Sequence, residues 1–252
     1  MPKTDFIVTI PSYRRAEKQE TLDCMRRLGI PKERIYIFVQ TEEDYKDYTR
    51  LYGAHANIVR SNATNVTTAR NAIIKHFSGS SDMLMMDDDI SAIGRLENGK
   101  LKKIEDQEEF ADAISACFNV ARKLKSPLFG IYPVYNDFFM SATISTKVTV
   151  NTVIGFVKGT ALYFDETYNT KEDIELCARL LSFGGNVARI NFLAPQAKHR
   201  TNKGGCYETW KSNANEIVVR RLCNAYPTIL APHPRKNSEV RVILPDKKIK
   251  VH

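Results

Sequence analysis

The sequence contains no apolar run long enough to span a membrane, and its N-terminus, Met-Pro-Lys-Thr-Asp, contains no apolar signal segment. We therefore expect a cytoplasmic protein with no membrane span. Cysteine is scarce: the five cysteines among 252 residues are scattered, odd in number and without a C-x-x-C spacing. The sequence thus predicts neither a disulfide framework nor a structural zinc site, and buried thiols are the default expectation.

The common motifs of phosphate chemistry are also missing. The chain has no G-x-x-x-x-G-K-[ST] loop, no G-x-G-x-x-G after a strand and no G-x-S-x-G elbow. These absences argue against a Walker-type nucleotidase and against the common dinucleotide-binding fold.

Excess charge of either sign is absent from the first 197 residues, which contain 25 basic and 25 acidic residues. The remaining residues, 198–252, contain twelve Lys or Arg and four Asp or Glu, so this segment accounts for the whole formal net charge of +8. Clustered Lys and Arg bind polyanions because they release condensed counterions from phosphates. The asymmetry predicts a polyanionic partner, and the alternative is a solvated basic face that aids solubility.

The most informative feature present is the apolar run Met83–Met86, which is followed at once by Asp87, Asp88 and Asp89. The run fits a strand buried on both faces. Three adjacent carboxylates repel one another, so a fold that gathers them is expected to supply a cation. Positions two apart in extended backbone point to the same side, which lets Asp87 and Asp89 converge while Asp88 faces elsewhere. All-oxygen ligands suit Mg²⁺ or Mn²⁺ shared with a phosphate, and the alternative is a solvated Asp-rich turn.

Strands and helices alternate along the chain in the manner of an α/β domain. Ligands of such open sheets bind outside the carboxyl ends of the strands, where the loop after the first strand and the acidic triplet are both expected. We expect strands at 5–10, 35–39, 57–60, 83–86 and 186–194, helices at 16–28, 42–51, 69–76 and 107–124, and a hairpin of 90–96 with 101–104.

Four motifs follow one another along the chain: Ile10-Pro-Ser-Tyr-Arg14, Thr68-Ala-Arg-Asn71, Met86-Asp-Asp-Asp89 and Glu172-Asp-Ile-Glu-Leu176. In this order the chain resembles glycosyltransferases of the GT-A fold, and especially the inverting enzymes that use nucleotide-diphosphate sugars. The resemblance implies an α/β fold with a Rossmann-like mixed sheet flanked by helices. It implies a GT-A catalytic domain at 1–200 and a basic C-terminal segment at 201–252 packed on it.

The resemblance also implies roles for individual residues. Asp87 and Asp89 would hold Mn²⁺ or Mg²⁺, with His199 completing the metal shell. Asp173, with Glu172 beside it, would be the catalytic base. The nucleotide-diphosphate sugar, by expectation a UDP-sugar, would be bound by Pro11, Ser12, Tyr13, Arg14, Gln40, Arg70, Asp87 and Asp88.

Several of these residues also fit simpler roles. Thr170 with Asp173, and the pair Thr67-Thr68, fit helix caps, and His199 fits an ordinary surface histidine. Gln40 stands after the second strand, where many members of the resembled family have an acidic residue that holds the base and ribose. The sequence therefore leaves the donor base open.

The implied reaction is an attack by an acceptor hydroxyl on the anomeric carbon, with Asp173 taking the proton. Attack from the face opposite the diphosphate inverts the configuration, although the metal half of the site is the same in retaining enzymes. A chain with a basic tail and no membrane segment resembles the bacteriophage glycosyltransferases that modify hydroxymethylated pyrimidines in DNA, a group related to the TET/JBP-associated glycosyltransferases. Basic and aromatic residues expected to bind DNA are Lys203, Trp210, Arg220 and Arg221.

The predicted acceptor is thus 5-hydroxymethylcytosine in DNA, and the location would be the host cytoplasm if a phage encodes the chain. Two alternatives remain at this stage. A transferase with a polysaccharide or lipid-linked acceptor would use the basic tail on anionic lipid. A Mg²⁺-dependent nuclease or phosphotransferase would also need clustered aspartates, but the ordered Arg-Asn and Glu-Asp motifs argue against it.

Overall fold

The computed structural model describes residues 5–77, 79–160, 162–197, 214–246 and 248–251. In chain order, the elements are β1 (Phe6–Pro11), α1 (Glu20–Arg27), η1 (Lys32–Arg34), β2 (Ile35–Val39), α2 (Glu42–Tyr52), β3 (Asn57–Arg60), α3 (Val66–Phe77), β4 (Asp82–Met86), β5 (Ile90–Glu97), β6 (Lys100–Lys103), α4 (Gln107–Lys123), β7 (Leu128–Ile131), η2 (Asp137–Phe139), β8 (Thr143–Ser145), β9 (Val153–Phe156), α5 (Glu172–Ser182), β10 (Ala188–Ile190), β11 (Leu193–Ala197), α7 (Ala214–Ala225), β12 (Leu230–His233), β13 (Lys236–Val242) and β14 (Ile249–Lys250).

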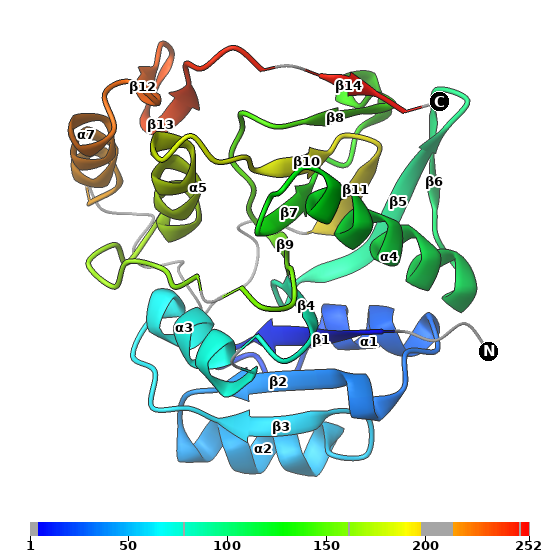
Figure 1. Cartoon of the computed structure of the whole chain (residues 1–252). Coiled ribbons are helices and arrows are strands. Elements are labelled where there is room, and N and C mark those ends of the chain that lie inside the picture. Colours follow the sequence, from blue (N-terminus) through cyan, green and yellow to red (C-terminus); the bar gives the residue numbers. More distant parts are fainter. Residues whose placement is uncertain (1–4, 78, 161, 198–213, 247, 252) are drawn as a thin grey trace.

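A mixed sheet of nine strands runs through the described part of the molecule in the order β14-β8-β10-β7-β9-β4-β1-β2-β3 (Figure 1). Strands β1 to β4 are parallel, and β9 lies antiparallel between β4 and β7. Strands β4, β7 and β10 therefore share one direction, so their carboxyl ends meet at the same edge of the sheet. The carboxyl end of β1 lies at the same edge, because β1 is parallel to β4.

Two apolar layers cover the faces of this sheet. Helices α1, α2 and α4 contribute to one layer, and α3, α5 and α7 contribute to the other. Strand β4 is buried on both faces because its apolar side chains alternate: Leu84 and Met86 enter the first layer, and Met83 and Met85 enter the second. The run of four apolar residues is thus the central strand that the sequence predicts.

The α/β fold predicted from the sequence is confirmed, and most elements lie within a few residues of their expected limits. The first helix begins at Glu20, not Ala16, and the third begins at Val66 because the Asn65 side chain accepts a hydrogen bond from Thr68 N at 2.9 Å. The expectation of one strand over 186–194 is wrong. The chain there forms β10 in the large sheet, turns at Asn191, and forms β11 in a smaller sheet with β5 and β6.

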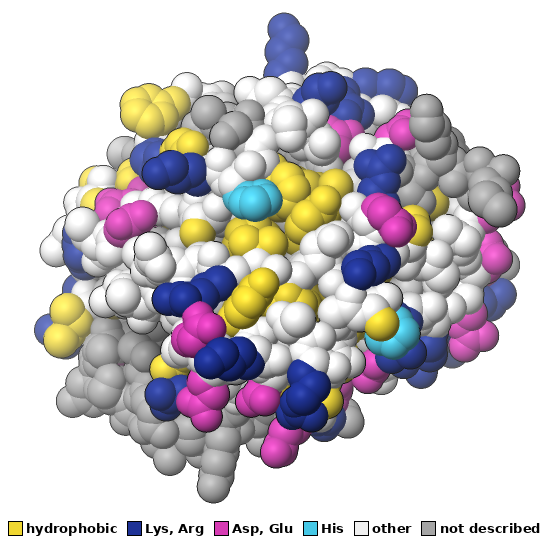
Figure 2. Space-filling model, turned by 90° about the horizontal axis from the view of Figure 1, so that it is seen from below, with side chains coloured by type: hydrophobic (Ala, Val, Ile, Leu, Met, Phe, Trp, Pro, Cys, Tyr) yellow, Lys and Arg dark blue, Asp and Glu magenta, His cyan; other side chains and the backbone are white. Residues whose placement is uncertain are grey.

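The C-terminal elements pack on the same sheet. Leu222 of α7 is buried in the layer that contains α5, and β14 pairs with β8 at the edge of the sheet. Figure 2 shows the face that lies below in Figure 1, where Lys and Arg side chains are interspersed with Asp and Glu. In the described parts of the chain, no helix is both long and apolar enough to cross a bilayer.

Candidate active site

The loops that follow β1 and β4 meet because these strands are parallel neighbours, with Thr9 paired to Met85. The acidic triplet therefore lies directly beside the loop that begins at Ser12. The backbone of the triplet is fixed as well: Asp87 N donates to Thr152 O at 2.9 Å. Thr21 Oγ1 donates to Asp87 O at 2.5 Å and accepts from Ile90 N at 2.9 Å.

Asp88 is buried and turns under the first loop. Its carboxylate accepts a hydrogen bond from Ser12 Oγ at 2.5 Å and forms an ion pair with Arg15. Ser12 Oγ in turn lies 2.7 Å from the Tyr48 hydroxyl and 2.9 Å from Gln19 Nε2. Burial raises the pKa of Asp88, although Arg15 and Ser12 oppose the shift. In this arrangement Asp88 supports the loop that follows β1.

Arg70 connects the acidic strand end with the start of α5. Its Nη2 donates to Asp87 Oδ1 at 2.9 Å, and its Nη1 lies 3.1 Å from Glu172 Oε1. The side chain is only 6% exposed, and its guanidinium lies 5.6 Å from the ring centroid of Phe164. Burial alone would lower the pKa of Arg70, but Glu172 and Asp87 raise it. Arg70 therefore stays charged between two carboxylates from distant parts of the chain.

Arg70 Nε is buried and makes no hydrogen bond to any described residue, and Nη1 has only the ion pair with Glu172. Buried donors without partners are rare in folded proteins. The observation indicates that the guanidinium has capacity for an acceptor group that is not part of the described chain.

The remaining carboxylates resist ionisation. Burial, together with the charges of Asp87 and Asp88, raises the pKa of Asp89 to about 7. Burial also raises the pKa of Asp173, although Arg70 opposes it, and Asp87 adds to the increase. The same causes act on Glu172, whose pKa is likewise raised. Asp87, Asp89, Glu172 and Asp173 thus share one charged region with Arg70.

Helix α5 presents two of these groups at its first turn. Glu172 is buried, and Asp173 Oδ1 accepts a hydrogen bond from Ile174 N at 2.8 Å. The residue before the helix is Lys171, with φ of 59°, and no side chain caps this end. The expected cap by Thr170 is therefore wrong, and the left-handed turn at Lys171 directs Glu172 toward Arg70.

The loop after β1 carries the other expected donor residues. Arg14 has φ of 53°, its N donates to Asp44 Oδ1 at 3.3 Å, and its guanidinium lies 5.0 Å from the ring centroid of Tyr13. Pro11 ends β1, and Gln40 follows β2 with its side chain partly exposed. Since Ser61 N donates to Val39 O at 2.8 Å, the ends of β2 and β3 also reach this edge.

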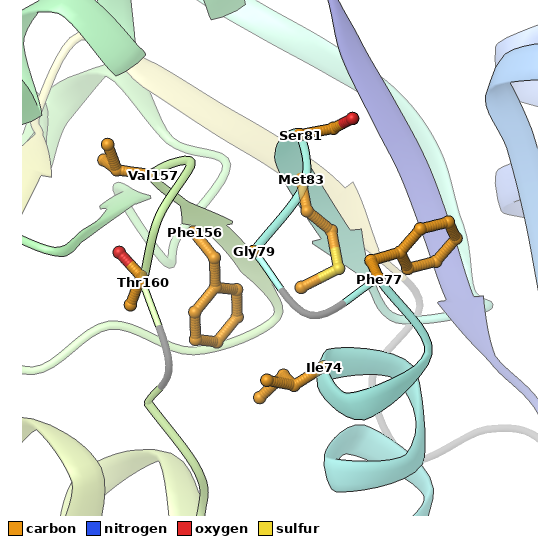
Figure 3. A pocket seen from close by; sticks show the side chains of 8 residues that line it. All are labelled: Ile74, Phe77, Gly79, Ser81, Met83, Phe156, Val157 and Thr160. Atoms are coloured by element: carbon orange, nitrogen blue, oxygen red, sulfur yellow. The ribbon is translucent and has the colours of Figure 1, made fainter.

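An open groove of about 480 Å³ lies on the outer side of α3. Asn71, the neighbour of Arg70, lines it and ties α3 to the segment before α5: its Nδ2 donates to Phe164 O at 3.0 Å and to Glu166 Oε1 at 2.9 Å. A second cavity, at the opposite end of β4, is lined by apolar side chains such as Ile74, Met83 and Phe156 (Figure 3). At about 10 Å³ it is too small for anything larger than a water molecule.

The family model of the TET-associated glycosyltransferases matches residues 6–205, which include all four sequence motifs and all the carboxylates described above. The chain belongs to this family. No curated protein sequence matches it significantly. The assignment makes the chain a glycosyltransferase, as the ordered motifs predict.

Solved structures show that this glycosyltransferase has the GT-A fold. A mannosyltransferase from Pyrobaculum calidifontis, in complex with GDP-Man and Mn²⁺, aligns with a TM-score of 0.59 and 15% identity, over 92% of this chain and 68% of that one. Glucosyl-3-phosphoglycerate synthase from Mycobacterium tuberculosis, in complex with Mg²⁺ and UDP, aligns with a TM-score of 0.54 and 10% identity, over 96% and 89% of the two chains.

Two of the three expected metal ligands, Asp87 and Asp89, lie within the described residues. Asp87 and Asp89 are hard oxygen donors, and their mutual repulsion, which contributes to the raised pKa of Asp89, is what a divalent cation would relieve. They therefore fit the expected metal as two of its ligands. Across the described segments, no three His, Cys, Asp or Glu side chains form a metal cluster, and His199 lies outside them.

The basic residues expected to bind DNA fall into two groups. Lys203 and Trp210 lie outside the described residues, whereas Arg220 and Arg221 lie on α7 and are exposed. Arg221 has partners within the chain: its Nη1 donates to Thr167 O at 2.9 Å, and its guanidinium lies 4.2 Å from the ring centroid of Tyr168. Arg221 thus holds the segment before α5.

Sequence reasoning missed Thr21, Gln19 and Tyr48, which fix the backbone and the loop at the acidic triplet. No local pattern marks these residues. Thr21 lies 66 and 69 positions from Asp87 and Ile90, and Tyr48 lies 36 and 29 positions from Ser12 and Gln19, so these contacts depend on the fold.

Proposed function

We propose that this glycosyltransferase transfers a sugar from a nucleotide-diphosphate sugar, by expectation a UDP-sugar, to the hydroxyl of 5-hydroxymethylcytosine in DNA. The observation that carries the proposal is the ionic connection from Asp87 through Arg70 to Glu172, because it places the acidic strand end next to the helix that bears Asp173. A donor diphosphate at the first group would bring its sugar toward the second.

The donor would lie over the loop after β1. Arg70 would offer Nε, which has no partner among the described residues, to a phosphate oxygen, and a guanidinium is well suited to phosphate contacts. Tyr13 and Arg14 follow β1, Gln40 follows β2, and all three are partly or fully exposed, so the nucleoside would lie against them. Asp88 contributes by holding Ser12, and through it the loop, in place.

Asp87 and Asp89, with His199, are the residues that would hold Mn²⁺ or Mg²⁺. A divalent cation there would neutralise the diphosphate as it leaves. The two relatives whose structures contain Mn²⁺ or Mg²⁺ with a nucleotide support this assignment.

Asp173 would act as the general base. Burial raises its pKa above that of an ordinary aspartate, which makes the ionised carboxylate a stronger base. The acceptor oxygen forms a bond to the anomeric carbon, the bond from that carbon to the diphosphate oxygen breaks, and the hydroxyl proton moves to Asp173. Attack opposite the leaving diphosphate gives inversion.

The acceptor is argued from the family description, which associates these enzymes with TET, and from the sequence resemblance to enzymes of hydroxymethylated pyrimidines. The basic segment 198–252 suits a polyanion. The family assignment favours glycosyl transfer over the nuclease or phosphotransferase alternative. A polysaccharide or lipid-linked acceptor is the second candidate, because the same base would serve any hydroxyl.

The test has two arms. A thermal-shift panel of nucleotide sugars with Mn²⁺ identifies the donor, since a ligand that binds the folded state raises the unfolding temperature. A transfer assay then offers that donor with duplexes containing 5-hydroxymethylcytosine or only cytosine, and product is scored by the mass of the released nucleosides. Transfer to the modified duplex alone supports the proposal, and donor binding without transfer to any DNA refutes the acceptor.

A further inference from the structure

The segment between β7 and β8, residues 132–142, exposes an aromatic pair. We call it the aromatic loop. Phe138 is 84% exposed and Phe139 is 57% exposed, and their rings meet edge to face with centroids 5.0 Å apart. Val134 in the same loop is 46% exposed. Neighbouring exposed apolar side chains of this size mark interaction surfaces more often than isolated ones do.

The aromatic loop is held firmly at its base. Tyr132 N is shared between the carbonyl oxygens of Ile190 and Leu193, at 3.1 and 2.8 Å, and Met140 is buried. The Tyr135 ring packs so closely on Gly94 that an added Cβ would lie 2.7 Å from it.

The turn that presents the pair is ordered as well. Asn136 Oδ1 accepts a hydrogen bond from Phe138 N at 3.0 Å, and Phe139 N donates to Asn136 O at 3.2 Å. The exposed rings are therefore presented by a structured turn.

The register of the large sheet places this loop near the carboxylates. Met85 of β4 and Gly130 of β7 both pair with Ile154 of β9, which lies between them. Asp87 and Tyr132 each lie two residues further along, at the same edge of the sheet. Two strand spacings amount to about 10 Å, so the aromatic loop leaves the sheet close to the acidic turn.

Basic residues flank the loop. Strand β14 pairs with β8, so that Lys250 lies opposite Thr143, and Val251 N donates to Ala142 O at 3.1 Å. Lys248 and Lys250 are exposed. The C-terminal strand thus places two cations beside the end of the aromatic loop.

We infer that the aromatic loop is the acceptor-docking element, with Phe138 and Phe139 stacking on nucleobases of the DNA while Lys248 and Lys250 contact phosphates. This inference rests on the proposed function. Exposed aromatic rings beside a basic strand match the two needs of nucleic acid, a face for base stacking and charge for the backbone. The loop begins two strands from β4 and ends at β8, four strands from β4, so DNA bound along this edge of the sheet would extend from the rings toward Asp87.

The test compares two pairs of substitutions. Phe138→Ala with Phe139→Ala should weaken binding of a fluorescent oligonucleotide at least about tenfold at every salt concentration, because each stacked base contributes substantially to affinity. Its salt dependence should stay the same. Lys248→Gln with Lys250→Gln should instead make the plot of log affinity against log salt concentration shallower by up to about two units, since each neutralised phosphate contributes about −0.9 to its slope.

Two further variants supply the controls. Phe183→Ala removes a Phe that is also 84% exposed but lies at the far end of α5, and it should leave binding and transfer unchanged. Phe138→Trp with Phe139→Trp should restore DNA binding, because the rings are retained. In the transfer assay, the double alanine variant should raise KM for DNA with little change in kcat.

The outcomes separate the inference from the proposed function. If the wild type transfers sugar to DNA and the double alanine variant does so with unchanged KM and affinity, the inference is wrong and the function stands. Equal losses with Phe183→Ala would also overturn it. If the wild type hydrolyses donor but neither binds nor modifies DNA, the proposed acceptor fails and the aromatic loop is left as a surface for a protein or lipid partner.

Discussion

Asn at position 89 should stabilise the metal-free protein at alkaline pH. The pKa of Asp89 rises from its ordinary 3.8 to about 7, first because the group is buried and then because Asp87 and Asp88 repel its charge. The folded state therefore binds the Asp89 proton more tightly than the unfolded state does. The stabilisation that Asp89 contributes to the folded state is fully present below a pH of about 4, and it is lost as the pH rises through about 7.

The magnitude follows from the size of the shift. If the whole difference between the folded and unfolded pKa of Asp89 is converted into free energy of unfolding, it amounts to about 4 kcal/mol. Because Asp89 is partly exposed, water and salt screen the repulsion, and we expect about 1–2 kcal/mol in practice. For a chain of this length that corresponds to about 2–8 °C in unfolding temperature.

The assay is urea unfolding of the wild type and Asp89→Asn in EDTA at pH 5 and pH 8. The free energy of unfolding of the wild type should fall between pH 5 and pH 8, and that of the variant should fall by about 1–2 kcal/mol less. The fall that remains in the variant should come from Glu172 and Asp173. Added Mn²⁺ should stabilise only the wild type at pH 8. Asp112→Asn, which changes an exposed carboxylate on α4, is the matched control. A variant no more stable than the wild type at pH 8 would refute the repulsion argument.

Three further expectations follow from the same site. Asp173→Asn should keep donor affinity but lower the transfer rate at least about a hundredfold, as measured by single-turnover transfer, and near-normal turnover would leave Asp173 without a role as base. Arg70→Met should lower unfolding stability by about 3–5 kcal/mol, because buried Glu172 loses its counter-ion, and calorimetry with Arg70→Lys as control checks this. Arg220→Ala should make the plot of log affinity for DNA against log salt concentration shallower by about one unit. Arg221→Ala should instead lower kcat, because Arg221 holds the segment before α5. Equal changes of slope in the two variants would contradict the contacts of Arg221.

The sequence was sufficient to predict the central strand. Four apolar residues between charged ones have few structures open to them, and β4 accordingly ends at Met86, while Asp88 and Asp89 lie in a turn. The structure shows Asp88 on the first loop, bound to Ser12 and Arg15. Local periodicity was enough here because the argument involved adjacent residues only.

The sequence could not predict what Arg70 does. A basic residue in an Ala-Arg-Asn motif suggests a phosphate partner, but the structure also pairs it with Glu172, about a hundred positions away. Such a contact depends on how α3 and α5 pack on one face of the sheet. The same limit explains the error at 186–194, where an apolar run changes sheets at Asn191 because its two halves have different partner strands.

The pairing of Arg70 with both Asp87 and Glu172 has a consequence for biosynthesis. Glu172 follows Asp87 by 85 residues, so a nascent chain can complete the first strands and the acidic turn well before α5 has been made. Until then Arg70 has only one of its two carboxylate partners, Asp87, and the proposed general base, Asp173, is absent. A ribosome-bound chain that ends before residue 172 therefore carries the acidic turn and Arg70 without the carboxylates of α5.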